Sequence, residues 1–141
     1  MALTRTETQL TWSAATSITI SDASRHDTDA FTFDATDVAA SVQLSADNAS
    51  TPSLGDTLVA YIKWTTGDVV TGGGDDYDTD EHAQYLMILD MYASNTPGED
   101  PAVKTLDIPV SAKGFKLSVV AAQGATHNVV VKARIATQRA A

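Results

Sequence analysis

The 141-residue sequence contains no cysteine, which excludes a disulfide framework, a thiol nucleophile and a thiolate metal site. It has no apolar run near the roughly 18 residues that a membrane-spanning helix requires, so we expect no transmembrane segment. No apolar stretch follows Met1, and we expect no secretory signal. Charged residues make up only 19% of the chain, which argues against a highly charged disordered protein and against a coiled coil.

Basic residues are scarce, because nine Lys and Arg face eighteen Asp and Glu and give a formal charge of −9. Nucleic acid is therefore not an expected partner, since phosphate binding requires clustered bases. Residues 22–107 hold seventeen acids and three bases, whereas the rest of the chain holds one acid and six bases. Two interpretations stay open: a solvated acidic surface, or a basic terminal region that faces something acidic, such as a neighbouring copy.

Polar and apolar residues alternate with a period of two over much of the chain, which predicts half-buried β-strands. The alternation covers residues 8–13, 17–21, 30–34, 41–46, 57–64, 104–110, 115–122 and 129–135. Residues 84–93 are apolar on both faces, and their β-branched and aromatic residues favour a central strand buried on both sides over a short helix. The predicted fold class is all-β: an antiparallel β-sandwich or jelly roll of about eight strands in a single domain.

We expect residues 1–9 to form an N-terminal arm and residues 10–141 to form the β-sandwich domain, with a long acidic, glycine-rich loop at 66–82. Within this loop the acids Asp76, Asp78 and Asp80 alternate, a spacing that can wrap oxygen ligands around calcium. An EF-hand loop would continue with glycine at its sixth position and glutamate at its twelfth, where this chain has Glu81 and Met87. We therefore expect a solvated or partner-binding loop before a metal site.

No pattern of residue types predicts catalysis. The chain has no G-x-S-x-G nucleophile elbow, and its three consecutive glycines lack the Lys-Ser/Thr pair of a phosphate-binding loop. The three histidines do not have the spacing of a zinc finger or a metalloprotease. We expect neither an enzyme nor a bound cofactor.

The candidate protein-interaction residues lie in the terminal segments and in the acidic loop. Tyr77 stands alone in the acidic loop, and an isolated loop tyrosine can anchor a partner surface. The other candidates belong to the N-terminal stretch and to the basic C-terminal region: Leu3, Arg5, Arg134 and Arg139.

The chain combines a Met-Ala start, the absence of cysteine, strands rich in Ala, Thr, Ser and Asp, and a polar N-terminal segment. In these features it resembles the small auxiliary proteins of tailed bacteriophages, especially capsid decoration (cement) proteins. Residues 114–125 and 129–135 are similar in style to the terminal hairpin of such virion sandwiches. The resemblance implies a non-enzymatic virion protein that binds the outer surface of a phage capsid and stabilises the shell.

The resemblance also implies partners and a location. The partners would be the major capsid protein and other copies of the chain, often as a trimer, without direct contact to nucleic acid or membrane. The protein would be made in the host cytoplasm and reside on the capsid surface of the virion. Two alternatives stay open: a phage tail or head-completion structural protein, and a carbohydrate-binding β-sandwich with aromatic side chains exposed on one concave face.

Overall fold

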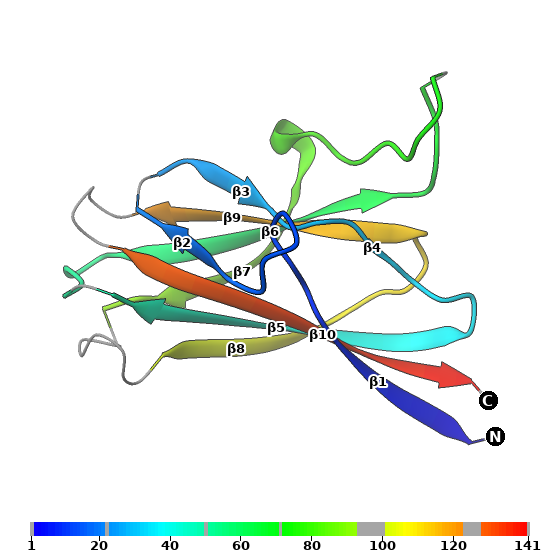
Figure 1. Cartoon of the computed structure of the whole chain (residues 1–141), viewed down its shortest axis with the longest axis horizontal. Coiled ribbons are helices and arrows are strands. Elements are labelled where there is room, and N and C mark those ends of the chain that lie inside the picture. The colour runs from blue at the N-terminus through cyan, green and yellow to red at the C-terminus, as the bar shows by residue number, and fades with distance from the viewer. Residues whose placement is uncertain are drawn as a thin grey trace.

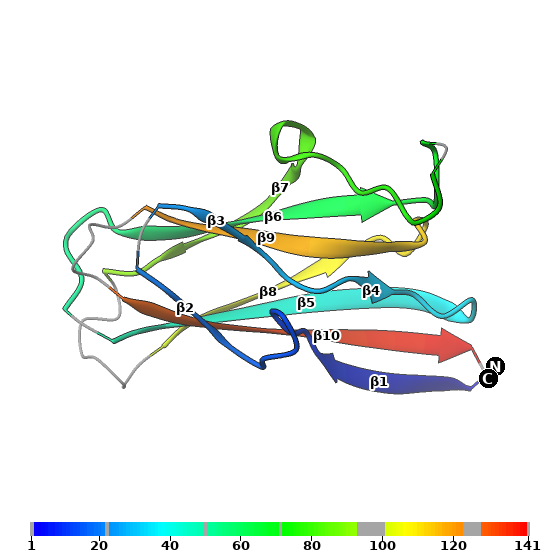
Figure 2. The same cartoon turned by 45° about the horizontal axis from the view of Figure 1, so that its top comes forward.

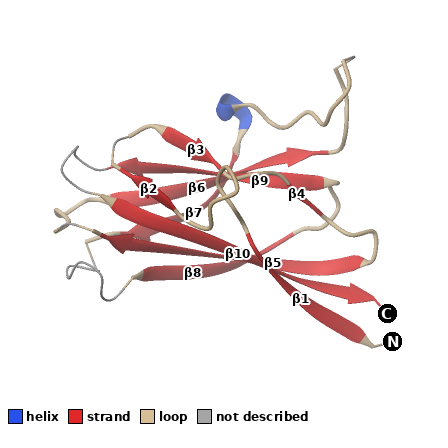
Figure 3. Cartoon of the chain, viewed as in Figure 1, coloured by secondary structure: helices blue, strands red, loops and turns tan. Residues whose placement is uncertain are grey.

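The computed structural model describes residues 2–21, 23–49, 51–70, 72–92, 101–122 and 128–140. These residues form ten β-strands and one 3-10 helix, η1 (Figures 1 and 3). In chain order the elements are β1 (Leu3–Gln9), β2 (Ile18–Ile20), β3 (Arg25–Asp27), β4 (Phe31–Thr32), β5 (Asp37–Asn48), β6 (Thr57–Thr65), η1 (Asp80–His82), β7 (Gln84–Asp90), β8 (Ala102–Ile108), β9 (Gly114–Ala122) and β10 (Val129–Ala140).

The strands form two antiparallel sheets that pack face to face, as Figure 2 shows. One sheet has the order β1-β10-β5-β8, with β2 also pairing with β10, and we call it the terminal sheet. The other has the order β3-β9-β6-β7, with β4 also pairing with β9, and we call it the loop sheet. The prediction of an antiparallel sandwich is confirmed. The described residues form ten strands where about eight were predicted, because the structure includes short strands of two or three residues.

The pairing follows one simple scheme in which the chain folds back on itself like a long hairpin. Strand β6 pairs with β7, β5 pairs with β8, β3 and β4 pair with β9, and β2 pairs with β10. Successive pairs of this rolled hairpin lie alternately in the two sheets, which is the jelly-roll form of the β-sandwich.

The core lies between the two sheets and follows the alternation in the sequence. Along β10, every second residue from Val129 to Ile135 is buried, and the intervening side chains face solvent or are half-buried. Strand β5 shows the same period along most of its length, because a strand in a sandwich covers the core with one face only. In β6 and β9 the core-facing residues keep this period, but Lys63 and Ser118 on the outer face are buried as well. Phe115 of β9 is the largest fully buried side chain, and it packs against the rings of Phe31, Phe33 and Trp64.

Strand β7 corrects one part of the prediction for residues 84–93. The segment is a strand and not a helix, as predicted, but it is an edge strand and not a central one. Tyr85 is 56% exposed and Ile88 is 42% exposed, because they lie on the outer face of the loop sheet. Apolar residues on both faces of this strand therefore mark a partly exposed apolar surface.

The N-terminal segment differs from the prediction in where its strand lies. Residues 3–9, expected as an arm, form β1 and pair with β10 along their whole length. The expected strand at residues 8–13 instead ends at Gln9, because the chain turns at Ser13 and Ala14, both of which have positive φ. The Asp29 carboxylate holds this turn by accepting the backbone N–H of Ala14 at 2.8 Å and the Thr11 hydroxyl at 2.6 Å.

Candidate interaction surface

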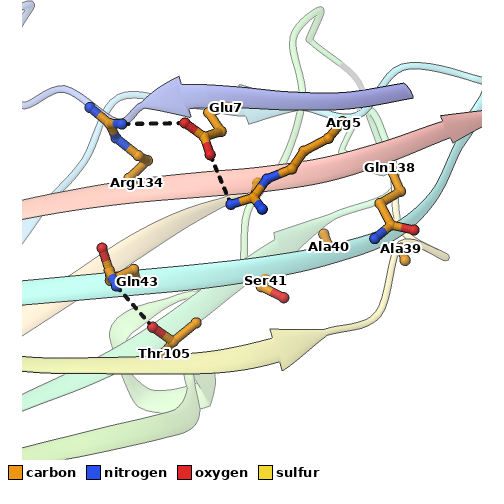
Figure 4. Close-up of a pocket in the computed structure, with 10 residues that line it drawn as sticks. Arg5, Glu7, Ala39, Ala40, Ser41, Gln43, Thr105, Arg134 and Gln138 are labelled. Carbon is orange, nitrogen blue, oxygen red and sulfur yellow. Dashed lines mark hydrogen bonds and ion pairs between the residues drawn. The ribbon is translucent and has the colours of Figure 1, made fainter. Parts of the chain in front are cut away.

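The outer face of the terminal sheet carries a shallow groove of about 330 Å³ (Figure 4). Its floor is made of small side chains, including Ala39 and Ser41 of β5 and Ala136 of β10. Longer polar side chains form its walls: Arg5, Glu7, Gln43, Thr105, Arg134 and Gln138. The groove forms because the small side chains of β5 and β10 leave a depression between the longer side chains that surround them.

Charged groups line one side of this groove. The Glu7 carboxylate lies 2.8 Å from the guanidinium of Arg5 and 3.5 Å from that of Arg134, as the dashed lines in Figure 4 show. All three side chains are about half exposed or more, so solvent screens these ion pairs and they contribute little to stability. They can therefore exchange partners when another charged surface approaches.

The fold brings four of the five candidate interaction residues onto one strand pair. Leu3 and Arg5 lie on β1, and Arg134 and Arg139 lie on β10, which runs antiparallel beside it. Arg5 and Arg134 line the groove, whereas Leu3 is 52% exposed near the end of β1. Arg139 instead donates a hydrogen bond of 2.8 Å to the carboxylate of Asp37, whose side chain is fully buried.

Tyr77, the fifth candidate, lies on the other side of the molecule. Its ring covers the ammonium group of Lys116 at 4.5 Å, on the outer face of the loop sheet. Burial, followed by the negative charge of Asp75, raises the pKa of the Tyr77 hydroxyl. The residue thus fastens the acidic loop to the sheet, and it is not part of the groove.

The acids considered as metal ligands have separate partners. Asp76 accepts the backbone N–H groups of Val69 and Val70, each at 2.8 Å, and these bonds lower its pKa. Asp78 accepts the backbone N–H of Trp64 at 3.0 Å. Within the described part of the chain, no three His, Cys, Asp or Glu side chains are grouped so that they could hold a metal ion.

Asp80 takes part in an ion cluster that the sequence did not reveal. The side chain of Lys63 is only 7% exposed, and its ammonium group contacts Asp80 and lies 2.7 Å from Asp27. Burial disfavours the charged form of Lys63, but hydrogen bonds to the two carboxylates outweigh burial and raise its pKa. The cluster ties η1 and β3 to the middle of the loop sheet.

Aromatic residues gather near this cluster on the outer face of the loop sheet. The rings of Tyr61 and Tyr85 meet edge to face with centroids 6.3 Å apart. The guanidinium of Arg25 lies 4.7 Å from the centroid of the Tyr61 ring. The pairing of β6 with β7 creates this aromatic patch, which residue periodicity alone did not predict.

No protein-family model matches the chain. No curated protein sequence matches it either. No helix in the described ranges is both long enough and apolar enough to cross a bilayer.

Solved structures resemble the chain in fold only. Dimeric latent PorU from Porphyromonas gingivalis is 7% identical with a TM-score of 0.50, covering 97% of this chain and 13% of that one. A chain of infectious bursal disease virus, Gx strain, is 12% identical with a TM-score of 0.48, and the match covers 97% of this chain and 32% of the viral chain. The CBM36-1 domain of a multidomain xylanase from the hindgut metagenome of Trinervitermes trinervoides is 10% identical with a TM-score of 0.45. This match covers 94% of the present chain and 96% of the xylanase domain.

The chain therefore spans less than a third of the length of the first two of these structures. The likeness extends across nearly the whole jelly roll of this chain, and it concerns the arrangement of strands. Together, the fold and the surface define an all-β sandwich domain with a polar groove on one outer face and an aromatic patch on the other.

Proposed function

We propose that this chain is a non-enzymatic virion structural protein that binds the outer surface of a phage capsid and stabilises the shell. The observation that carries the proposal is the strand pair formed by β1 and the C-terminal half of β10. This pair projects at the end of the molecule where both termini lie (Figure 1). Most of β1 is exposed on both faces, so it can contact a neighbouring protein while the sandwich remains folded.

The distribution of charge supports a defined orientation on the shell. Strands β1 and β10 together carry four bases and one acid, whereas the acidic loop lies against the outer face of the opposite sheet. A terminal sheet that faces an acidic capsid surface would leave the acidic loop toward solvent. Charge complementarity of this kind guides association and fixes orientation more than it adds affinity.

A rigid sandwich is suited to this role because its binding surface stays formed when it is free. Many copies on one shell act together, so a modest affinity for each site is enough to brace the joints between capsid subunits. The half-exposed groove charges Arg5, Glu7 and Arg134 are available for such contacts without disturbing the core.

Truncation of residues 2–8 provides the first test of the proposal. The truncated chain is expected to keep its sandwich and to lose most of its copies from purified virions of the source phage. A finer test is the double substitution Arg5→Glu with Arg134→Glu, matched by Lys104→Glu on β8, the opposite edge strand of the same sheet. Copy number should fall for the double variant and stay unchanged for the control, and an unchanged double variant would contradict the proposal.

The aromatic patch supports a second candidate function, carbohydrate binding. Tyr85 is 56% exposed beside the partly buried Tyr61, and an exposed aromatic ring offers an apolar face with a polar tip to a sugar ring. A glycan array separates the two functions. Binding that is lost in Tyr85→Ala but kept after truncation of residues 2–8 would favour carbohydrate recognition over capsid binding.

A further inference from the structure

We propose that two copies of this chain associate through the free edge of β1, about a two-fold axis that passes beside Thr6 of each copy. The two terminal sheets then join into one continuous sheet across the axis. This pairing needs no capsid, so it can hold whether or not the proposed function does.

Strand β1 offers an edge for such pairing that no described strand covers. It pairs with β10 on one side, and no other described strand pairs with it on the other. Proteins usually protect long edges with charged side chains, proline or a bulge; residues 3–9 contain no proline and no bulge, and their two charged residues, Arg5 and Glu7, have opposite signs. The side chains of Thr4, Arg5, Glu7 and Thr8 are exposed, so neither face of the strand is covered in a way that would block an approaching strand.

The backbone of β1 determines which residues can bond to a new strand. The N–H of Leu10 donates to the carbonyl oxygen of Ala133 at 2.9 Å, just beyond the end of β1. Residues in an antiparallel pair alternate between hydrogen-bonded and non-hydrogen-bonded positions. Even-numbered residues of β1 therefore bond to β10, and the N–H and C=O groups of Leu3, Arg5, Glu7 and Gln9 point to the free edge.

The side chains of β1 then select one register for two antiparallel copies. With Thr6 on the axis, Arg5 of each copy lies opposite Glu7 of the other, and Thr4 lies opposite Thr8. Opposite charges and threonine pairs both stabilise neighbouring strands. With Arg5 on the axis two arginines would face each other, and with Glu7 on the axis two glutamates would, and like charges at these positions are destabilising.

The charges that would form this interface already lie together on one face. Arg5 and Glu7 are 2.8 Å apart within one copy, and Arg134 lies 3.5 Å from the same carboxylate. When the second copy arrives, Arg5 can turn to the Glu7 of that copy while Arg134 continues to hold its own Glu7. The exchange stays on the open outer face, so no charge has to be buried without a partner.

Sedimentation equilibrium of the purified full chain tests the proposal. The wild-type chain is expected to be a dimer in equilibrium with monomer. Arg5→Glu and Glu7→Arg, each alone, should raise the dimer dissociation constant about tenfold or more, because each places like charges opposite one another. Circular dichroism of every variant checks that the fold is retained, and Lys104→Glu on β8 serves as the matched control that keeps the dimer.

Variants that swap the charges of Arg5 and Glu7 make the test specific for this register. The double variant Arg5→Glu with Glu7→Arg should dimerise again, and an equimolar mixture of the two single variants should form a heterodimer. A wild-type chain that stays monomeric or forms a trimer would overturn the proposal. A dimer that is unaffected by Arg5→Glu, or single variants that fail to combine on mixing, would overturn it as well.

Discussion

Gly114 provides a direct test of how closely β4 packs against β9. It begins β9 at the point where β4 lies against it, with Thr32 opposite Gly114 and Phe31 opposite Phe115. A Cβ atom on Gly114 would overlap the carbonyl oxygen of Phe31 and lie 3.1 Å from the Cα of Thr32. Because both obstructing atoms belong to the backbone, rotation of a side chain cannot relieve the overlap, and β4 must move.

The magnitude of the effect follows from this geometry. Overpacking in a well-packed region costs about 1–3 kcal/mol, and we expect Gly114→Ala to lower the free energy of unfolding by about 2 kcal/mol. An unfolding entropy of about 2.1 cal/mol/K per residue converts this loss into a Tm about 7 °C lower for a chain of 141 residues. The displaced β4 would also loosen the packing of Phe31 against Phe115, whose ring centroids are 5.5 Å apart.

Thermal unfolding followed by circular dichroism measures this difference. Gly72→Ala is the matched control, because nothing lies within 4 Å of its added Cβ. The control should change the free energy of unfolding by less than about 0.5 kcal/mol. If Gly114→Ala unfolds at the same temperature as the control, the close approach of β4 to β9 is refuted.

Three further predictions concern the core and the ionised groups. Leu44→Ala removes a fully buried side chain of β5 and should cost about 3 kcal/mol in urea denaturation, whereas Val38→Ala at an exposed site should be nearly neutral. Lys63→Met should raise the pKa of Asp80, because the hydrogen bond from Lys63 is the main cause that lowers it; an unchanged NMR titration would contradict this. The pKa of Asp29 is lowered, mainly by the hydrogen bond from the Thr11 hydroxyl. The ionised Asp29 carboxylate therefore stabilises the folded state above about pH 4, and this stabilisation is lost as the pH falls through the lowered pKa. Urea midpoints between pH 5 and pH 2.5 should therefore fall less steeply for Asp29→Asn than for the wild type.

The regular strands could be predicted from the sequence because their faces have different environments. In β9 and β10 one face covers the core and the other faces outward, so residues such as Leu117 and Val131 reveal the period directly. The ends of strands were harder to predict. The predicted strand at residues 129–135 continues to Ala140, because β1 and β5 supply backbone partners for it there.

Strand β7 shows where periodicity fails. Its apolar residues on both faces predicted burial, but burial depends on which strands lie beside it and on what covers its outer face. The turn at Ser13 is a similar case, since it depends on Asp29, a residue sixteen positions away in the sequence. Neither relation can be deduced from local alternation.

The candidate surface was predictable only in part. The excess of bases in the terminal segments pointed to Arg5 and Arg134, and the pairing of β1 with β10 places them beside the same groove. Other groove residues, such as Gln43 and Thr105, lie within strands that the sequence predicted at residues 41–46 and 104–110. Which strands become neighbours is decided by the tertiary fold, so the groove itself could not be predicted.

Quantitative mass spectrometry of purified phage virions, in which the proposed function requires this chain to be present, tests that function most directly. We expect the chain to copurify with the shell in a fixed ratio to the major capsid protein, and truncation of residues 2–8 to lower this ratio. Virions that lack the chain, or that retain the truncated form at the wild-type ratio, would contradict the proposed function.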